Sequence, residues 1–93
     1  MSEIDKLVIK ECKKDPEFAR EYRKERERLT AAIALLKLRE EEGMTQRELA
    51  AAAGKPQSTI ARIENGNLNP SVKLLSEIAE SLDRKLEFTF AKI

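Results

Sequence analysis

The sequence predicts an all-α fold, a small bundle of helices that ends in one short strand. Apolar residues recur at spacings of three and four along most of the 93 residues, which is the period of helices with one buried face. Residues that cap helix N-termini also stand directly in front of the main apolar runs, at Ser2, Asp15, Thr45 and Ser71. This length makes one domain with an appended element.

The first 30 residues are predicted to form a helical extension in front of the main domain. Ser2 and Asp5 fit a capping box for a helix over about residues 3–13. Asp15-Pro16 indicates the start of a second helix, because Asp caps helix N-termini and Pro favours the first helical position. Helix is then expected over residues 16–42, either as one rod or as two pieces with a bend between them.

Residues 45–66, TQRELAAAAGKPQSTIARIENG, are typical of two short helices joined by a turn. Thr45 and Glu48 fit a second capping box, and Gly54 stands where the first short helix must end with a positive φ. The apolar positions expected to face a common core are Leu49, Ala50, Ala53, Ile60 and Ile63. This pattern indicates a helix-turn-helix, which lays its second helix in the DNA major groove. An ordinary helical hairpin is the alternative.

The C-terminal part is predicted to be a helix followed by a strand. Ser71 caps the helix, whose inner face is expected to comprise Val72, Leu75, Ile78, Ala79 and Leu82. Apolar and polar residues then alternate, so that Leu86, Phe88 and Phe90 share one face of a strand. A lone strand leaves its backbone unpaired and needs a neighbour. The simplest neighbour is the same strand of a second copy, with these three residues in a homodimer interface; an edge strand of another protein or a frayed tail are the alternatives.

Composition argues against an enzyme and gives no sign of a cofactor. The chain has no histidine and a single cysteine, Cys12, which removes the commonest general base, the commonest metal ligand and any intramolecular disulfide. No metal site is therefore expected. No apolar stretch has the length of a membrane helix, and together these features suit the cytoplasm. The net charge is only +1, so DNA affinity must come from a few well-placed basic residues and from dimerisation.

Residues 35–82 resemble the lambda-repressor-like helix-turn-helix family, also called the XRE family. The matching segments are Leu38-Arg39, Gly43-Met44-Thr45-Gln46, Glu48-Leu49-Ala50, Gly54, Gln57-Ser58-Thr59-Ile60, Arg62-Ile63-Glu64-Asn65-Gly66 and Asn69-Pro70-Ser71. The resemblance implies that Gln46 holds a DNA phosphate and that Gln57, Ser58 and Arg62 face base edges. It also implies that Arg39 pairs with Glu64. The full set of expected DNA contacts is Gln46, Gln57, Ser58, Thr59, Arg62 and Asn65.

Two features depart from the family pattern. Proline occupies position 56, where many relatives place Ser or Thr as the cap of the second short helix, and Pro56 offers no capping oxygen. Glu40-Glu41-Glu42 brings three carboxylates near a surface that is expected to approach phosphates. Both features predict weaker DNA binding by a single copy.

The whole chain also resembles a narrower group, the single-domain antitoxins of the HigA type. The resemblance rests on the architecture and on the segment Asp15-Pro16-Glu17-Phe18. It implies a type II antitoxin that binds a RelE-like (HigB-type) ribonuclease toxin and represses its own operon as a dimer. The expected partner-binding residues, which could equally pack on the chain's own core, are Ile4, Leu7, Val8, Phe18 and Tyr22.

The predicted organisation is therefore a partner-binding extension over 1–30, a DNA-binding domain over 31–83 and a dimerisation strand over 84–93. A stand-alone repressor without a toxin partner is the second interpretation. A third is an adaptor protein that uses the same scaffold without DNA.

Overall fold

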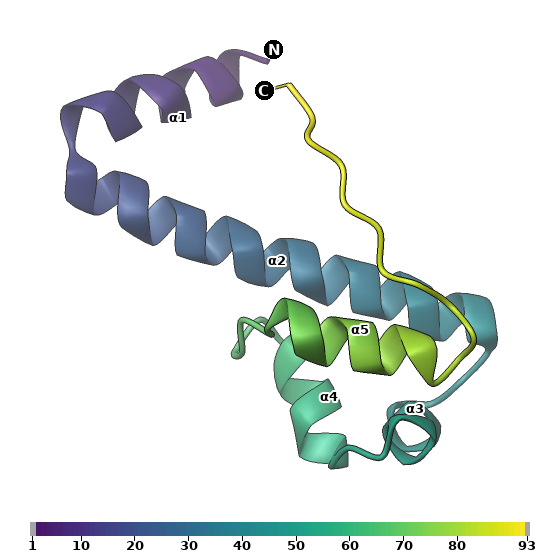
Figure 1. Cartoon of the computed structure of the whole chain (residues 1–93). Helices are drawn as coiled ribbons and strands as arrows, with labels where there is room; N and C mark the ends of the chain where they lie inside the picture. The colour runs from purple at the N-terminus through teal and green to yellow at the C-terminus, as the bar shows by residue number, and fades with distance from the viewer. Residues whose placement is uncertain (1, 93) are drawn as a thin grey trace.

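The computed structural model describes residues 2–92, and these residues form five helices (Figure 1). In chain order they are α1 (Glu3–Lys14), α2 (Pro16–Glu42), α3 (Gln46–Ala53), α4 (Gln57–Glu64) and α5 (Val72–Glu80). The all-α prediction is confirmed. α2 runs for 27 residues without interruption, so residues 16–42 form one helix and not two pieces with a bend between them. None of the helices in this part of the chain combines the length and the apolar character needed to cross a membrane.

The predicted capping residues begin their helices as expected. Ser2 Oγ accepts a hydrogen bond from the Asp5 backbone N–H at 3.1 Å, and the Asp5 carboxylate accepts one from the Ser2 N–H at 3.4 Å. The Asp15 carboxylate accepts hydrogen bonds from the first backbone N–H groups of α2 at 3.0 and 3.2 Å. Ser71 Oγ does the same for α5 at 3.0 Å. These bonds satisfy amide groups that have no partner within the helix.

Helix α2 is the spine of the molecule. Its C-terminal half carries α3, α4 and α5, whereas α1 folds back along its N-terminal half (Figure 1). The resulting shape is elongated, with extents of 45 × 23 × 20 Å and a radius of gyration of 15.4 Å. A compact domain of this length has a radius of gyration of roughly 12 Å. The N-terminal arm, formed by residues 2–26, therefore extends away from the bundle that contains the core.

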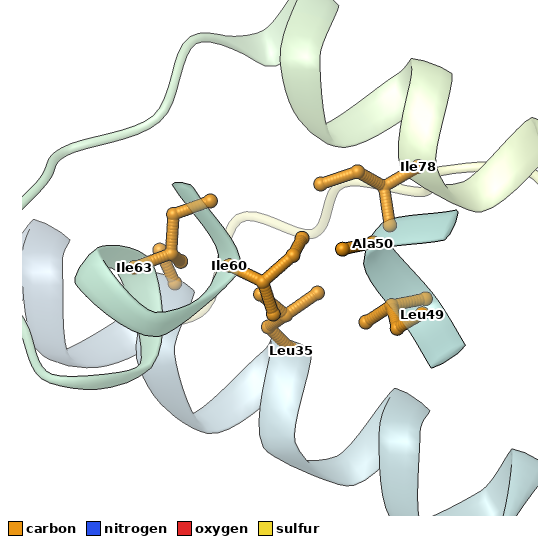
Figure 2. Close-up of a cluster of buried hydrophobic side chains, with 7 residues drawn as sticks. Leu35, Leu49, Ala50, Ile60, Ile63 and Ile78 are labelled. Atoms are coloured by element: carbon orange, nitrogen blue, oxygen red, sulfur yellow. The ribbon is translucent and has the colours of Figure 1, made fainter. Parts of the chain in front are cut away.

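The core lies where α2, α3, α4 and α5 meet. Leu35, Leu49, Ile60, Ile63 and Ile78 are almost completely removed from solvent and point toward one another (Figure 2). Burying each of these large aliphatic side chains contributes about 1.5–3 kcal/mol, so the contact holds four helices together. The core predicted for the helix-turn-helix is confirmed.

The inner face predicted for α5 is correct for all its members but one. Ile78 and Ala79 are buried, and Leu75 and Leu82 are partly buried. Val72 is exposed, because it lies about 120° around α5 from the fully buried Ile78 and so falls at the border of the buried face.

The predicted C-terminal strand is wrong for this single chain. Residues 84–92 form no strand, and the backbone of residues 85–92 makes no hydrogen bond within the described part of the chain. The physical reason is that a strand requires a neighbouring strand, and the all-α bundle offers none. The tail instead leaves α5 as extended chain, with Leu86 half-buried and Phe88 and Phe90 exposed.

Candidate nucleic-acid interface

The turn between α3 and α4 is built by Gly54. Its φ of +65° is left-handed, a conformation that glycine adopts without steric cost. The Gly54 N–H donates to the Ala51 carbonyl at 3.2 Å, and the Lys55 N–H donates to the Ala50 carbonyl at 2.9 Å. This pair of bonds ends α3 abruptly and lets α4 start three residues later.

Helix α4 is oriented by its two isoleucines. Ile60 and Ile63 are completely buried, so the opposite side of the helix faces outward. With about 100° between successive residues, Ser58, Arg62 and Asn65 fall on one outward stripe. All three are exposed. This stripe is the part of α4 that can enter a groove in DNA.

The two remaining residues expected to contact DNA from α4 stand beside this stripe. Gln57 is exposed on one flank in the first turn, and Thr59 is half-buried on the other flank. Pro56 precedes them with a φ of −62° and no side-chain hydrogen bond to the helix. The first backbone N–H groups of α4 therefore lack a side-chain cap.

Arg39 and Glu64 meet across the bundle in a two-pronged ion pair. Arg39 Nε donates to Glu64 Oε2 at 2.9 Å, and its Nη2 donates to Oε1 at 3.0 Å. The Glu64 side chain is only 3% exposed, and that of Arg39 is 23% exposed. Arg39 also donates to the Met44 carbonyl at 3.1 Å, and its pKa is raised by the hydrogen bond to Glu64. The pair ties the end of α2 to the end of α4.

Gln46 joins this pair at the start of α3. Its Nε2 donates to Glu64 Oε1 at 3.1 Å, while its side chain remains half-exposed. An amide nitrogen carries two N–H groups, so one is committed to Glu64 and the other stays available. Thr45 and Glu48 fix the same helix start with reciprocal bonds of 3.1 and 3.0 Å, and the bond from the Thr45 N–H lowers the pKa of Glu48. The capping box predicted from the sequence is confirmed.

Comparison with known proteins supplies the family. A family profile described as helix-turn-helix matches residues 35–88, more than half of the chain. The chain belongs to the lambda-repressor-like (XRE) helix-turn-helix family. The matched segment contains residues 35–42 at the end of α2, all of α3, α4 and α5, and the start of the tail.

Several known proteins are similar in sequence to this XRE-family protein over about half of its length. Two HTH-type transcriptional regulators of Archaeoglobus fulgidus are 42% and 45% identical to it over 48 and 47 residues. These matches cover 52% and 50% of this chain and 69% and 66% of theirs. A Sinorhizobium fredii HTH-type transcriptional regulator, y4dL, is 42% identical over 48 residues, which is 52% of this chain and 24% of its own length. The chain thus spans about a quarter of that regulator. No solved structure was found to match this chain.

The acidic run at the end of α2 forms ion pairs with Arg84, which the sequence did not predict. Arg84, at the start of the tail, donates to Glu42 at 2.8 Å and to Glu41 at 2.8 Å. These bonds raise the pKa of Arg84. Arg84 thus binds two of the three carboxylates expected to weaken DNA binding and balances one of their three negative charges. No sequence signal marks such a pair, because the partners are more than 40 residues apart.

Two other contacts were also missed. Lys55 in the turn forms an ion pair with Glu77 of α5, which lowers the pKa of Glu77. Asn69 donates to Glu27 at 2.9 Å, so the loop after α4 is attached to α2. Both contacts hold the helix-turn-helix against its neighbours.

The residues expected to bind a partner lie outside the XRE domain core and do not form one cluster. Val8 and Tyr22 line a groove of about 360 Å³ between α1 and α2. Phe18 stacks on Tyr22 with ring centroids 6.2 Å apart. Ile4 and Leu7 point to solvent, and α1 contains no buried residue. Packing on the chain's own core, which was the alternative for all five residues, therefore does not hold for Ile4 and Leu7 of α1.

Proposed function

We propose that this protein is a dimeric operator-binding repressor that also serves as the antitoxin of a type II toxin–antitoxin pair. It neutralises a RelE-like (HigB-type) ribonuclease toxin and represses its own operon. The observation that carries the antitoxin part is the N-terminal arm, which has an exposed apolar face and no part in the bundle core.

The DNA-binding part is supported by the outward stripe of α4. Arg62 is exposed in the middle of that stripe, and an arginine there can bind guanine with two hydrogen bonds. Gln46 donates its free N–H to a phosphate, since Glu64 holds its amide at the start of α3. Phosphate contacts fix the register, and base contacts fix the sequence preference.

The test of repression uses the DNA directly upstream of the protein's own gene. Binding is measured by fluorescence anisotropy to that fragment and to a shuffled fragment of the same length and composition, at several salt concentrations. We expect a specific affinity that exceeds the nonspecific one by about 10³-fold or more. Equal affinity for both fragments would exclude autorepression.

Dimerisation through the tail is supported by its chemistry. Phe88 and Phe90 are exposed, and the extended backbone around them has no hydrogen-bond partner within residues 2–92. Pairing with the tail of a second copy would cover both aromatic rings and satisfy these backbone groups. The double substitution Phe88→Ser with Phe90→Ser should leave the bundle folded and convert the dimer to a monomer in sedimentation. A variant that still sediments as a dimer would place the dimer interface on another surface.

The antitoxin part rests on α1. Ile4 is 73% exposed and lies on the same flank as Leu7, on a helix that packs against α2 and contains no buried residue. We expect this flank to contact the toxin. The test is co-expression with the protein encoded by the adjacent reading frame, followed by affinity purification and a growth assay. Ile4→Ser with Leu7→Ser should weaken the complex and restore toxicity, whereas operator binding should not change.

A stand-alone repressor is the second candidate. It is favoured by the curated relatives, whose names describe HTH-type transcriptional regulators and mention no toxin. In that case the adjacent reading frame yields no binding partner, and the N-terminal substitutions change neither growth nor operator binding.

A further inference from the structure

A hollow of about 510 Å³ lies beside the outward stripe of α4. It is formed where α2 passes the loop Asn65–Asn67 that follows α4. Leu29 and Tyr22 line its middle on α2, because they lie within about 20° of each other around the helix. Arg26 and Arg28 line its two sides, about 60° and 100° around the helix from Leu29 in opposite directions. We call this feature the α2–α4 hollow.

The two arginines of the α2–α4 hollow have hydrogen-bond donors that the chain leaves unused. Arg26 is exposed, forms no ion pair within residues 2–92, and lies 5.9 Å above the ring of Tyr22. Arg28 donates to Glu25 at 3.3 Å, and its buried Nε has no hydrogen-bond partner in the described part of the chain. Because a guanidinium carries five N–H groups, both arginines keep donors available for an anion.

The loop on the other side of the α2–α4 hollow adds further donors. The exposed side-chain amides of Asn65 and Asn67 donate to no other group among residues 2–92. The backbone N–H groups of these two residues and of Gly66 donate to carbonyls in the last turn of α4 at 2.9–3.1 Å. These bonds satisfy carbonyls that would otherwise present partial negative charge at the end of the helix. A hydrogen bond from Asn69 to Glu27 at 2.9 Å attaches the loop to α2.

The charge around the α2–α4 hollow favours an anion. Glu25 is the one carboxylate among the described residues that line it, against two arginines, and Glu25 already accepts a hydrogen bond from Arg28. The surrounding stretch of α2, residues 20–28, carries five basic and three acidic side chains, so its net charge is +2. A phosphate suits such a site, because its oxygens accept several hydrogen bonds and arginine binds it with two parallel ones.

The α2–α4 hollow is continuous with the surface that faces DNA. Asn65 belongs both to the outward stripe of α4 and to the lining of the hollow. With a rise of about 1.5 Å per residue, Asn65 stands about 10 Å along α4 from Ser58, and the major groove is about 12 Å wide. A helix that places Ser58 at the base edges therefore brings Asn65, and the hollow beside it, to the phosphates that border the groove.

We infer that Arg26 and Arg28 bind a phosphate of the DNA strand that borders the major groove, with Asn65 and Asn67 on the other side of the same hollow. The contact extends the DNA interface beyond residues 35–88, the segment that matches the family, onto the N-terminal half of α2. This inference rests on the proposed DNA binding. It adds affinity for any DNA sequence, because a phosphate contact carries no information about the bases.

The test measures the Kd of the full chain by fluorescence anisotropy at several salt concentrations, for the upstream fragment and for the shuffled fragment. Arg26→Gln with Arg28→Gln should weaken binding to both fragments at least about tenfold. The slope of log Kd against log salt concentration should fall by about 1 per copy. Arg20→Gln with Lys24→Gln is the matched control. It removes the same charge from the far side of α2, about 140–180° around the helix from Leu29, and should change the Kd and the slope far less.

A second measurement changes the DNA and keeps the wild-type protein. Each phosphate that borders the site is replaced in turn by an uncharged methylphosphonate. At one position per half-site, the replacement should weaken binding by the wild type but not by the double glutamine variant, since both changes remove the same contact. Arg26→Lys with Arg28→Lys should keep most of the salt dependence, because lysine still offers a cation to a phosphate. Thermal melts and sedimentation of all variants should match those of the wild type.

The outcomes separate this inference from the function on which it rests. If the double glutamine variant matches the control in Kd and slope, or if no methylphosphonate distinguishes it from the wild type, the inference is overturned and operator binding stands. If the wild type binds both fragments equally and the variant still weakens both, autorepression is excluded and the phosphate contact stands. If the wild type binds neither fragment, both proposals are overturned. If the variant binds DNA normally but loses the protein encoded by the adjacent reading frame, the hollow binds protein and the inference is overturned.

Discussion

Replacing Glu64 with alanine is the sharpest test of how the helix-turn-helix is held together. The carboxylate accepts three hydrogen bonds, two from Arg39 and one from Gln46, at 2.9–3.1 Å. Glu64→Ala removes all three. It leaves the Arg39 cation with a single bond, to the Met44 carbonyl.

The magnitude follows from burial. Removing one partner of a buried ion pair costs about 3–5 kcal/mol, whereas an exposed pair costs under about 1 kcal/mol. Glu64 is buried, but solvent reaches part of Arg39 and relieves part of the penalty. We therefore expect a loss of about 3 kcal/mol. At about 4–8 °C per kcal/mol for a domain of this size, Tm should fall by about 12–24 °C.

Thermal melts and urea unfolding of Arg39→Ala, Glu64→Ala and the double variant complete the measurement. The double variant should be less destabilised than the sum of the single variants, since it leaves no unpaired charge. Glu77→Ala is the matched control, because its pair with Lys55 is partly exposed and its loss should lower Tm far less than the loss of Glu64. Small, additive effects for Arg39 and Glu64 would refute the argument from burial.

Three further predictions concern DNA contacts, the turn and pH. Arg62→Ala should relax the sequence preference at one base pair per half-site, at a cost of about 1–3 kcal/mol in binding free energy. Gln46→Ala should instead weaken binding to all DNA sequences alike. Equal losses of affinity for specific and random DNA with Arg62→Ala would contradict its role in reading a base. Gly54→Ala should cost about 1 kcal/mol in urea unfolding, entirely from its φ of +65°, because no atom lies within 4 Å of the added Cβ. The ion pair with Lys55 lowers the pKa of Glu77, so the ionised carboxylate stabilises the fold at pH values above the ordinary carboxyl range, about pH 4.3. This contribution is lost as the pH falls through the folded-state pKa. Glu77→Gln should therefore have a lower urea midpoint than the wild type at pH 7, and the difference should shrink as the pH falls below the ordinary carboxyl range.

The local signals in the sequence predicted helix starts and stops well. Ser2, Asp15, Thr45 and Ser71 cap the helices for which they were selected, and Gly54 ends α3 with the expected left-handed backbone. These features depend on interactions within three or four residues. The strand predicted for the tail was wrong because a strand depends on a neighbour that this chain does not supply.

The sequence by itself determined the helix-turn-helix, its core and the residues available to face DNA, since apolar periodicity decides which side of each short helix is buried. Only the tertiary structure decided which apolar residues of α2 are used. Leu35 and Leu29 belong to the same periodic run, yet Leu35 is buried beneath α3, α4 and α5 and Leu29 faces solvent. The structure also decided that Arg84 forms hydrogen bonds to both Glu41 and Glu42. Contacts between residues so far apart form only when packing brings the helices together, so they have no local pattern that a sequence could display.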